Sequence, residues 1–171
     1  MQRIGVIADT HGLLRPEAIA FLQGCSHIIH AGDIGDAEVL GKLASLAPVT
    51  AVRGNNDGGE WAQRLRVRET IRVAGVNIHV IHDLGEMQPD ADCSSVQVVV
   101  SGHSHKPAIT QRADTLFVNP GSAGPRRFKL PVSIGELIVR DDGSVAAHIQ
   151  ELSVTPARRP RAKGGRPQSR G

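Results

Sequence analysis

The chain has 171 residues, a formal net charge of +3, two cysteines, three Phe, one Trp and no Tyr. This length predicts one domain with a sizeable core, and two cysteines exclude a disulfide-rich scaffold. No apolar run reaches the ~18 residues of a membrane span, and the apolar run at the N-terminus is too short for a signal peptide. We therefore expect no membrane association and a cytoplasmic location, where thiols stay reduced.

The positive charge is concentrated at the C-terminal end. Six of the 20 lysines and arginines fall in residues 156–171, which hold no acidic residue, so the rest of the chain carries 14 basic against 17 acidic residues, a net charge of −3. We predict a folded domain over residues 1–155 and a basic, disordered tail over 156–171. The tail either contacts nucleic acid or an acidic partner, or only keeps the chain in solution.

Three apolar runs in the first half are typical of strands covered on both faces. They span residues 4–8, 27–31 and 49–52. Two helices are predicted between them, one from Pro16 to just before Gly24 and one over 37–46 with Asp36 as its N-cap. This βαβαβ order predicts parallel strands joined by right-handed crossovers.

The second half shows the alternating pattern of antiparallel strands. Such strands are predicted over 70–73, 76–80, 109–118 (a hairpin turning near Ala113-Asp114), 134–139 and 145–152, with a buried strand over 96–100. Parallel units followed by antiparallel strands fit two packed mixed sheets with helices outside.

Polar side chains follow five of these runs. They are Asp9 and His11, Asp33, Asn55, His82, and His103 and His105. Because the carboxyl ends of strands line the ligand crevice of α/β sheets, we expect these side chains to converge. Imidazole and carboxylate together suit Mn, Fe, Zn, Co or Ni rather than calcium. Seven donors are too many for one ion, whereas two ions about 3.5–4 Å apart that share a carboxylate would use them all.

The expected backbone conformation would help the donors to converge. An extended backbone would place both donors of Asp9-x-His11 on one side, and likewise those of His103-x-His105. Gly32, Gly54 and Gly102 precede donors and would let the backbone approach an ion closely.

The ordered set Asp-x-His, Gly-Asp, Gly-Asn-x-Asp, His and Gly-His-x-His resembles the calcineurin-like metallophosphoesterases. The short length, Gly-His-Ser-His and the later Asn119-Pro120-Gly121-Ser122 resemble the small prokaryotic phosphodiesterase branch of that superfamily. The resemblance covers roughly residues 1–152. It implies an α/β fold, a four-layer α/β/β/α sandwich of two mixed sheets flanked by helices.

The resemblance also implies site assignments. One ion would be held by Asp9, His11, Asp33 and His105, and the other by Asp33, Asn55, His82 and His103. Asp33 would bridge the ions, and Asn55 would ligate through its carbonyl oxygen, leaving its amide to a phosphate oxygen. Manganese is the first expectation for both ions, with nickel, zinc, iron or cobalt as alternatives. The implied activity is phosphodiester hydrolysis by in-line attack of a hydroxide that bridges the metals.

One departure from the family concerns the leaving group. Many members carry a histidine after the Gly-Asn pair that protonates the leaving group or stabilises charge, and Asn56 stands there in this chain. The obvious general acid is therefore missing, which favours substrates whose leaving group needs little help. A phosphomonoesterase remains an alternative, and so does an interaction scaffold, since the phosphoesterase-like subunit of the retromer coat has this fold and a degraded site.

Several nearby residues keep two interpretations each. His30 either supports the site through a hydrogen bond or is a satisfied buried histidine. Asp83 either orients His82 or belongs to a surface turn, and Asn119 belongs either to a loop beside the site or to a tight turn. Arg126 and Arg127 either reach a phosphate or lie on a solvated surface. The expected partner is a small phosphoester, and a homo-oligomer is left open.

Overall fold

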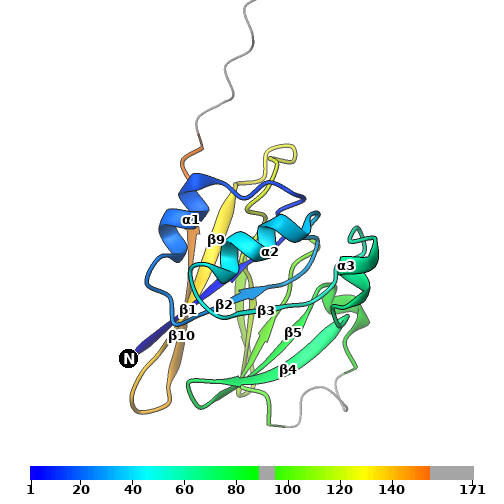
Figure 1. The fold of residues 1–171 in the computed structure, drawn as a ribbon. Helices are drawn as coiled ribbons and strands as arrows, with labels where there is room; N and C mark the ends of the chain where they lie inside the picture. The colour runs from blue at the N-terminus through cyan, green and yellow to red at the C-terminus, as the bar shows by residue number, and fades with distance from the viewer. Residues whose placement is uncertain (89–94, 155–171) are drawn as a thin grey trace, which may run out of the picture.

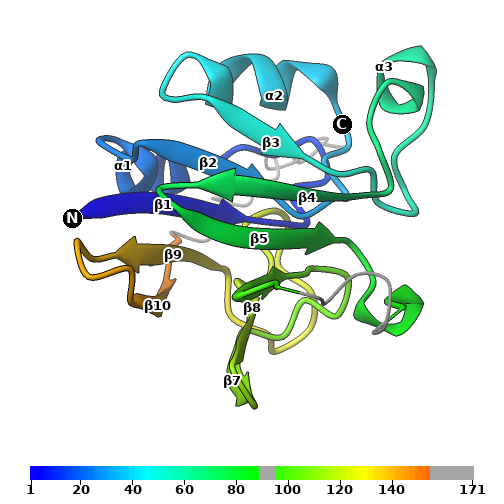
Figure 2. The same ribbon diagram turned by 90° about the horizontal axis from the view of Figure 1, so that it is seen from below.

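The computed structural model of the chain describes residues 1–88 and 95–154. Its strands form two five-stranded sheets that pack face to face (Figures 1 and 2). The first sheet has the order β10-β9-β1-β2-β3, and the second has the order β4-β5-β6-β8-β7. The predicted sandwich of two mixed sheets is thereby confirmed.

The first sheet combines both ends of the chain. Its strands are β1 (Gln2–Ile7), β2 (His27–His30), β3 (Val49–Ala51), β9 (Ser133–Val139) and β10 (Val145–Glu151). The pairs β1–β2 and β2–β3 are parallel, as predicted, and β9 joins the other edge of β1 antiparallel. The outer face carries α1 (Pro16–Leu22) and α2 (Ala37–Ala44), which Figure 1 shows lying across it.

The second sheet contains the middle of the chain. Its strands are β4 (Arg68–Val73), β5 (Val76–Ile81), β6 (Val98–Val100), β7 (Ala108–Arg112) and β8 (Thr115–Asn119). The hairpins β4–β5 and β7–β8 are antiparallel, whereas β5–β6 and β6–β8 are parallel. The first hairpin turns at Ala74 and Gly75, which both have positive φ, as in a type I′ turn.

The main core lies between the two sheets. Alternate residues of β1, such as Ile4 and Val6, pack with Ile78 and Val80 of the second sheet. The intervening Ile7 points to the other face and packs with residues of α1 and α2 such as Leu22 and Leu43. This alternation follows from the two-residue period of a strand, and it explains why the β1 sequence is apolar on both faces.

The outer face of the second sheet has a thinner cover within the described residues. The 3₁₀ helix η1 (Leu84–Glu86) lies there, and Leu84 and Met87 pack against Ile81 and Val99. A further short helix, α3 (Glu60–Gln63), was not anticipated from the sequence. Among residues 1–88 and 95–154, no helix has the length and apolar character needed to cross a bilayer.

Other expectations are confirmed in detail or lie outside the described residues. Asp36 caps α2, accepting a hydrogen bond of 2.8 Å from the Glu38 N–H, although the helix ends at Ala44 rather than at residue 46. Cys25 is buried beside α1. Cys93 and the basic segment 156–171 fall outside the described residues, so the predicted tail stays a prediction.

Candidate metal centre

The loops that follow β1, β2, β3, β5 and β6 meet at one edge of the sandwich. Backbone hydrogen bonds join them in pairs: the Asp9 N–H donates to the Gly32 carbonyl at 3.0 Å, and the Gly102 N–H donates to the His82 carbonyl at 3.0 Å. This is the edge at which parallel strands present their carboxyl ends. The topology thus brings the predicted donors together.

The seven predicted donors form one continuous series of neighbouring atoms. His105 Nε2 lies 3.3 Å from Asp9 Oδ1 and 3.5 Å from His11 Nε2, which in turn lies 3.8 Å from Asp33 Oδ2. The other oxygen of Asp33, Oδ1, is 3.4 Å from His82 Nε2, and Asn55 Oδ1 is 3.1 Å from both His82 Nε2 and His103 Nδ1. Asp33 therefore faces one imidazole with each of its oxygens.

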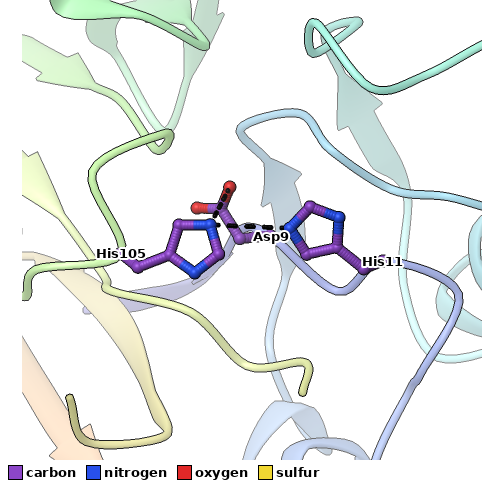
Figure 3. A group of neighbouring side chains, drawn as sticks. All are labelled: Asp9, His11 and His105. Carbon is purple, nitrogen blue, oxygen red and sulfur yellow. Dashed lines mark hydrogen bonds and ion pairs between the residues drawn. The ribbon is translucent and has the colours of Figure 1, made fainter. Parts of the chain in front are cut away.

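Two groups of three donors are compact enough to hold an ion. Asp9, His11 and His105 form one, drawn in Figure 3, and Asp9, Asp33 and His82 form the other. Asp9 belongs to both groups, although the resemblance implies that Asp33 is the bridging carboxylate. Both carboxylates are almost completely buried.

The backbone at the donors is not extended, and this part of the prediction is wrong. Five donors have φ between 46° and 65°, in the left-handed region: Asp9, His11, Asp33, His103 and His105. Residues with a side chain are uncommon in that region and each costs about 1–3 kcal/mol there. The donors converge because the strands end before them and the backbone turns sharply at each one.

The neighbouring glycines make room for donor residues rather than for an ion. A Cβ atom on Gly54 would lie 2.2 Å from both the backbone nitrogen and Oδ1 of Asp33. A Cβ atom on Gly32, which has a φ of 89°, would lie 2.6 Å from Nδ1 of His82. These contacts explain why the residues before the donors lack side chains.

The protonation states favour cation binding at the His11 end. Burial is the main reason why the pKa of His11 lies below its usual value and that of His105 falls to about 4. Both imidazoles are therefore neutral at pH 7, and their Nε2 atoms face each other (Figure 3). Burial raises the pKa of Asp9 to about 7, so a bound cation would be needed to keep this carboxylate fully ionised at neutral pH. Within the described residues, Asp9 Oδ1 is buried and receives no hydrogen bond.

These features fit a metal ion. A buried carboxylate oxygen without a donor is costly, and a divalent cation beside it would satisfy that oxygen. Two neutral imidazoles with facing nitrogens are likewise suited to share a cation. The donor groups combine imidazole nitrogen with carboxylate oxygen.

His82 and Asp33 show how the second group is organised. His82 Nδ1 lies 2.7 Å from the Ala31 carbonyl oxygen and must donate to it, and Nε2 faces Asp33. Burial acts to lower the pKa of His82, but its hydrogen bonds to Asp33 and to the Ala31 carbonyl outweigh burial and hold this pKa above its usual value. A cation bound at Nε2 would take the place of that proton. Burial acts to raise the pKa of Asp33, but hydrogen bonds from His82 and Asn56 outweigh it, and the pKa lies well below its usual range. Asn56 donates to Asp33 from its backbone N–H at 2.8 Å and from Nδ2 at 2.6 Å.

Asp83 lies in a turn and does not contact the ring of His82 in the way that an orienting residue would. It does not orient His82, whose Nδ1 is bound to the Ala31 carbonyl. Instead its Oδ1 accepts a hydrogen bond from the Gly85 N–H at 2.8 Å and caps η1, and its Oδ2 lies 3.7 Å from His103 Nε2. Asp83 is therefore a turn residue that also faces a predicted donor.

His30 supports the loop that carries Asp9 and His11. Its Nε2 is 2.9 Å from Thr10 Oγ1, and the same hydroxyl donates to the Ile34 carbonyl at 2.9 Å, so His30 must be the donor to Thr10. Burial is the main cause that lowers the pKa of His30 to about 3, which keeps the ring neutral. The first interpretation of His30 holds, because it fixes the loop between Asp9 and His11. It is fully buried but not fully satisfied, because its Nδ1 has no hydrogen-bond partner within the described residues.

The segment from Asn119 to Ser122 fastens two donor loops. Asn119 Nδ2 donates to the Gly102 carbonyl at 2.7 Å and to Ser104 Oγ at 3.1 Å, which fixes the loop that carries His103. Ser122 Oγ donates to the Asp9 carbonyl at 3.0 Å. Asn119 is therefore a positioning residue beside the site, and it also caps its own turn by accepting from the Gly121 N–H.

The two arginines after this segment lie apart. Arg126 is exposed and its guanidinium is 4.0 Å from Glu151 in β10, so of its two interpretations the solvated surface holds. Arg127 Nη2 lies 3.3 Å from His11 Nε2.

A cavity of about 330 Å³ opens at the other end of the donor series, where its lining includes Asn55, His82 and His103.

Comparison with known proteins identifies the family. Residues 2–142 match the model of the calcineurin-like phosphoesterase superfamily domain. The chain belongs to this superfamily. A probable metallophosphoesterase of Methanothermobacter thermautotrophicus is 34% identical to it over 155 residues, covering 82% of this chain and 86% of that protein.

Two solved structures show the same fold as this calcineurin-like phosphoesterase. A structure of an archaeal phosphodiesterase superposes with a TM-score of 0.71 and 23% identity, covering 87% of this chain and 100% of that one. Vps29 of Chaetomium thermophilum superposes with a TM-score of 0.68 and 21% identity, covering 89% and 97%. The superfamily implies a metal-dependent phosphoester hydrolase, and the donor groups described above are suited to bind the metal.

Sequence reasoning missed three contacts that shape the centre: Thr10 with His30, Asn56 with Asp33, and Ser122 with the Asp9 carbonyl. It named Arg127 together with Arg126 and did not distinguish between them. Thr10, Asn56 and Ser122 each lie within a recognised motif. Their contacts, however, cross between strands that are far apart in the chain.

Proposed function

We propose that this calcineurin-like phosphoesterase is a phosphodiesterase with two divalent ions in its centre. The observation that carries the proposal is the unbroken series of donor atoms from Asp9 to His103. No step in that series exceeds 3.8 Å, and its members come from five separate loops. Such convergence of carboxylate, amide and imidazole has no function in a folded core and is suited to cations.

The residues divide between the ions as the superfamily pattern implies. The first ion would take Asp9, His11, Asp33 and His105, and the second would take Asp33, Asn55, His82 and His103. Divalent ions bound there would supply Lewis acidity and an activated water for in-line attack on phosphorus. Asp33 suits the bridging position because its two oxygens face different imidazoles. Asn55 directs Oδ1 at the histidines, which leaves its amide nitrogen for a phosphate oxygen.

The preference for diesters rests on the lack of a proton donor. Asn56 stands where a histidine would act as general acid, and its side chain is engaged with Asp33. A departing alkoxide therefore receives no proton from this position, which disfavours monoesters of poor leaving groups. The cavity at the Asn55 end, whose lining also includes Arg53 and Glu86, has room for an ester substituent.

A matrix of metals and substrates tests the proposal. Metal-free protein is reconstituted with Mn, Ni, Zn, Fe or Co and assayed on an aryl phosphodiester, an aryl phosphomonoester and cyclic nucleotides. We expect hydrolysis that requires metal, is strongest with Mn and favours the diester. Asp33→Ala should abolish it, whereas Asp114→Ala, in the exposed β7–β8 turn, should keep it.

Two other results would each overturn the proposal. A higher kcat/KM on the monoester would make the protein a phosphomonoesterase. Metal binding without hydrolysis of any ester would favour an interaction scaffold on this fold, the role left open by the sequence. Removal of residues 156–171 separately tests whether the basic segment contributes nucleic-acid affinity.

A further inference from the structure

Arg127 occupies a position that the metal centre itself does not explain. It lies in the exposed segment that follows Gly124, and its Nη2 is 3.3 Å from His11 Nε2. Among residues 1–88 and 95–154 it forms no ion pair with a carboxylate, whereas the adjacent Arg126 lies 4.0 Å from Glu151. The cation of Arg127 thus points to a predicted metal ligand and lacks a fixed counter-charge.

The segment that carries Arg127 is anchored to the loop that carries Asp9. The Ala123 N–H donates to the Ala8 carbonyl at 3.1 Å, and the guanidinium of Arg15 donates to the Gly124 carbonyl at 3.1 and 3.2 Å. A Cβ atom on Gly124 would lie only 2.5 Å from the Asp9 carbonyl oxygen. Arg127 is three residues from this contact, so its guanidinium is kept within reach of the His11 end of the centre.

The contact between Arg127 and His11 is incompatible with a metal on the same atom. The single lone pair of a neutral imidazole nitrogen either accepts a hydrogen bond or binds a cation. An ion on His11 would therefore require Arg127 to release Nε2, and the anchored segment would keep the guanidinium near that ion. Two cations this close repel each other unless an anion lies between them.

The anion that fits is the phosphoryl group of the substrate. A guanidinium binds phosphate oxygens through two parallel N–H···O bonds, and such charge-assisted bonds are among the strongest in proteins. We propose that Arg127 binds the non-bridging oxygens of the substrate phosphoryl group beside the ion that Asp9, His11 and His105 would hold. This inference rests on the proposed function, and it places the ester substituent toward the cavity at the Asn55 end.

Adjacent arginines offer a matched pair of variants. Arg127→Gln removes the charge and keeps a polar side chain, Arg127→Lys keeps the charge without the planar fork, and Arg126→Gln is the control. Each protein is loaded with Mn, its metal content is measured, and its affinity for inorganic phosphate is determined by calorimetry at fixed ionic strength. Hydrolysis of an aryl phosphodiester is measured in parallel.

We expect Arg127→Gln to bind phosphate about tenfold or more weakly and to lose a similar factor in kcat/KM, with unchanged metal content. Arg127→Lys should fall between it and wild type, and Arg126→Gln should match wild type within about twofold. Unchanged phosphate affinity in Arg127→Gln, or an equal loss in Arg126→Gln, would overturn the inference, and so would loss of metal in Arg127→Gln. If the wild-type protein hydrolyses no ester, the proposed function fails, but the phosphate measurement still tests Arg127.

Discussion

Asn56 donates two hydrogen bonds to the carboxylate of Asp33, one from its backbone N–H and one from its side chain. The position that lacks the expected general acid thus has another use, because Asn56 orients the carboxylate proposed to bridge the ions. Hydrogen bonds of this kind keep a ligand ionised and fix the direction of its lone pairs.

Replacement of the Asn56 side chain should weaken metal binding. Asn56→Ala removes the bond from Nδ2 and keeps the backbone bond, and partners of metal ligands typically contribute 10–100-fold in affinity. We expect metal affinity, measured by competition with a chelator, to fall by at least about tenfold. Asn77→Ala is the control, because the Asn77 side chain in β5 donates to the Ser95 carbonyl, away from the centre. Equal metal affinity in the two variants would show that Asn56 does not support the centre.

Gly54 should be intolerant of even one methyl group. The added Cβ in Gly54→Ala would lie 2.2 Å from Asp33, so the backbone of one of the two loops must move. We expect a loss of ~1–3 kcal/mol in the free energy of unfolding and weaker metal binding. In Gly58→Ala, in the same loop, the methyl group meets no atom within 4 Å. Urea unfolding and metal titration of both variants check this, and wild-type metal binding by Gly54→Ala would refute it.

His30 should make the metal-free protein sensitive to acid. Its pKa is lowered from 6.5 to about 3 by burial, so the unfolded chain binds a proton that the folded protein excludes. Exclusion of this proton has no effect on the free energy of unfolding above pH 6.5. As the pH falls from 6.5 toward 3, it lowers the free energy of unfolding by about 1.4 kcal/mol per pH unit. In His30→Gln, which can still donate to Thr10, that dependence should disappear.

Urea unfolding in the presence of a chelator, between pH 7 and pH 5, measures the effect. The difference in the free energy of unfolding between wild type and His30→Gln should shrink as the pH falls. A pH-independent difference for His30→Gln would mean that the folded protein accommodates the charged ring.

The sequence contained enough to predict the sheets and the members of the centre. Each donor follows an apolar run, and such runs become strands whose carboxyl ends share one edge, so Asp9, Asp33 and His82 could be placed together without coordinates. The hairpin turns at Ala74-Gly75 and Ala113-Asp114 could also be placed from local pattern alone.

The orientation of the side chains could not be predicted in the same way. It depends on left-handed backbone at donors such as His11 and His105, which a strand pattern does not reveal. The choice between Arg126 and Arg127 depends on how the segment after Gly124 is anchored to the Asp9 loop, and the role of Asn56 depends on a neighbouring strand. These are contacts between residues distant in the chain, whereas periodicity reports only on local structure.

Anomalous diffraction from crystals of the protein soaked in Mn²⁺ shows whether two ions share the carboxylate of Asp33. We expect two peaks about 3.5–4 Å apart, one beside His11 and His105 and the other beside His82 and His103, with Asp33 between them. A single peak, or peaks only at other places in the molecule, would mean that the chain holds no dinuclear centre.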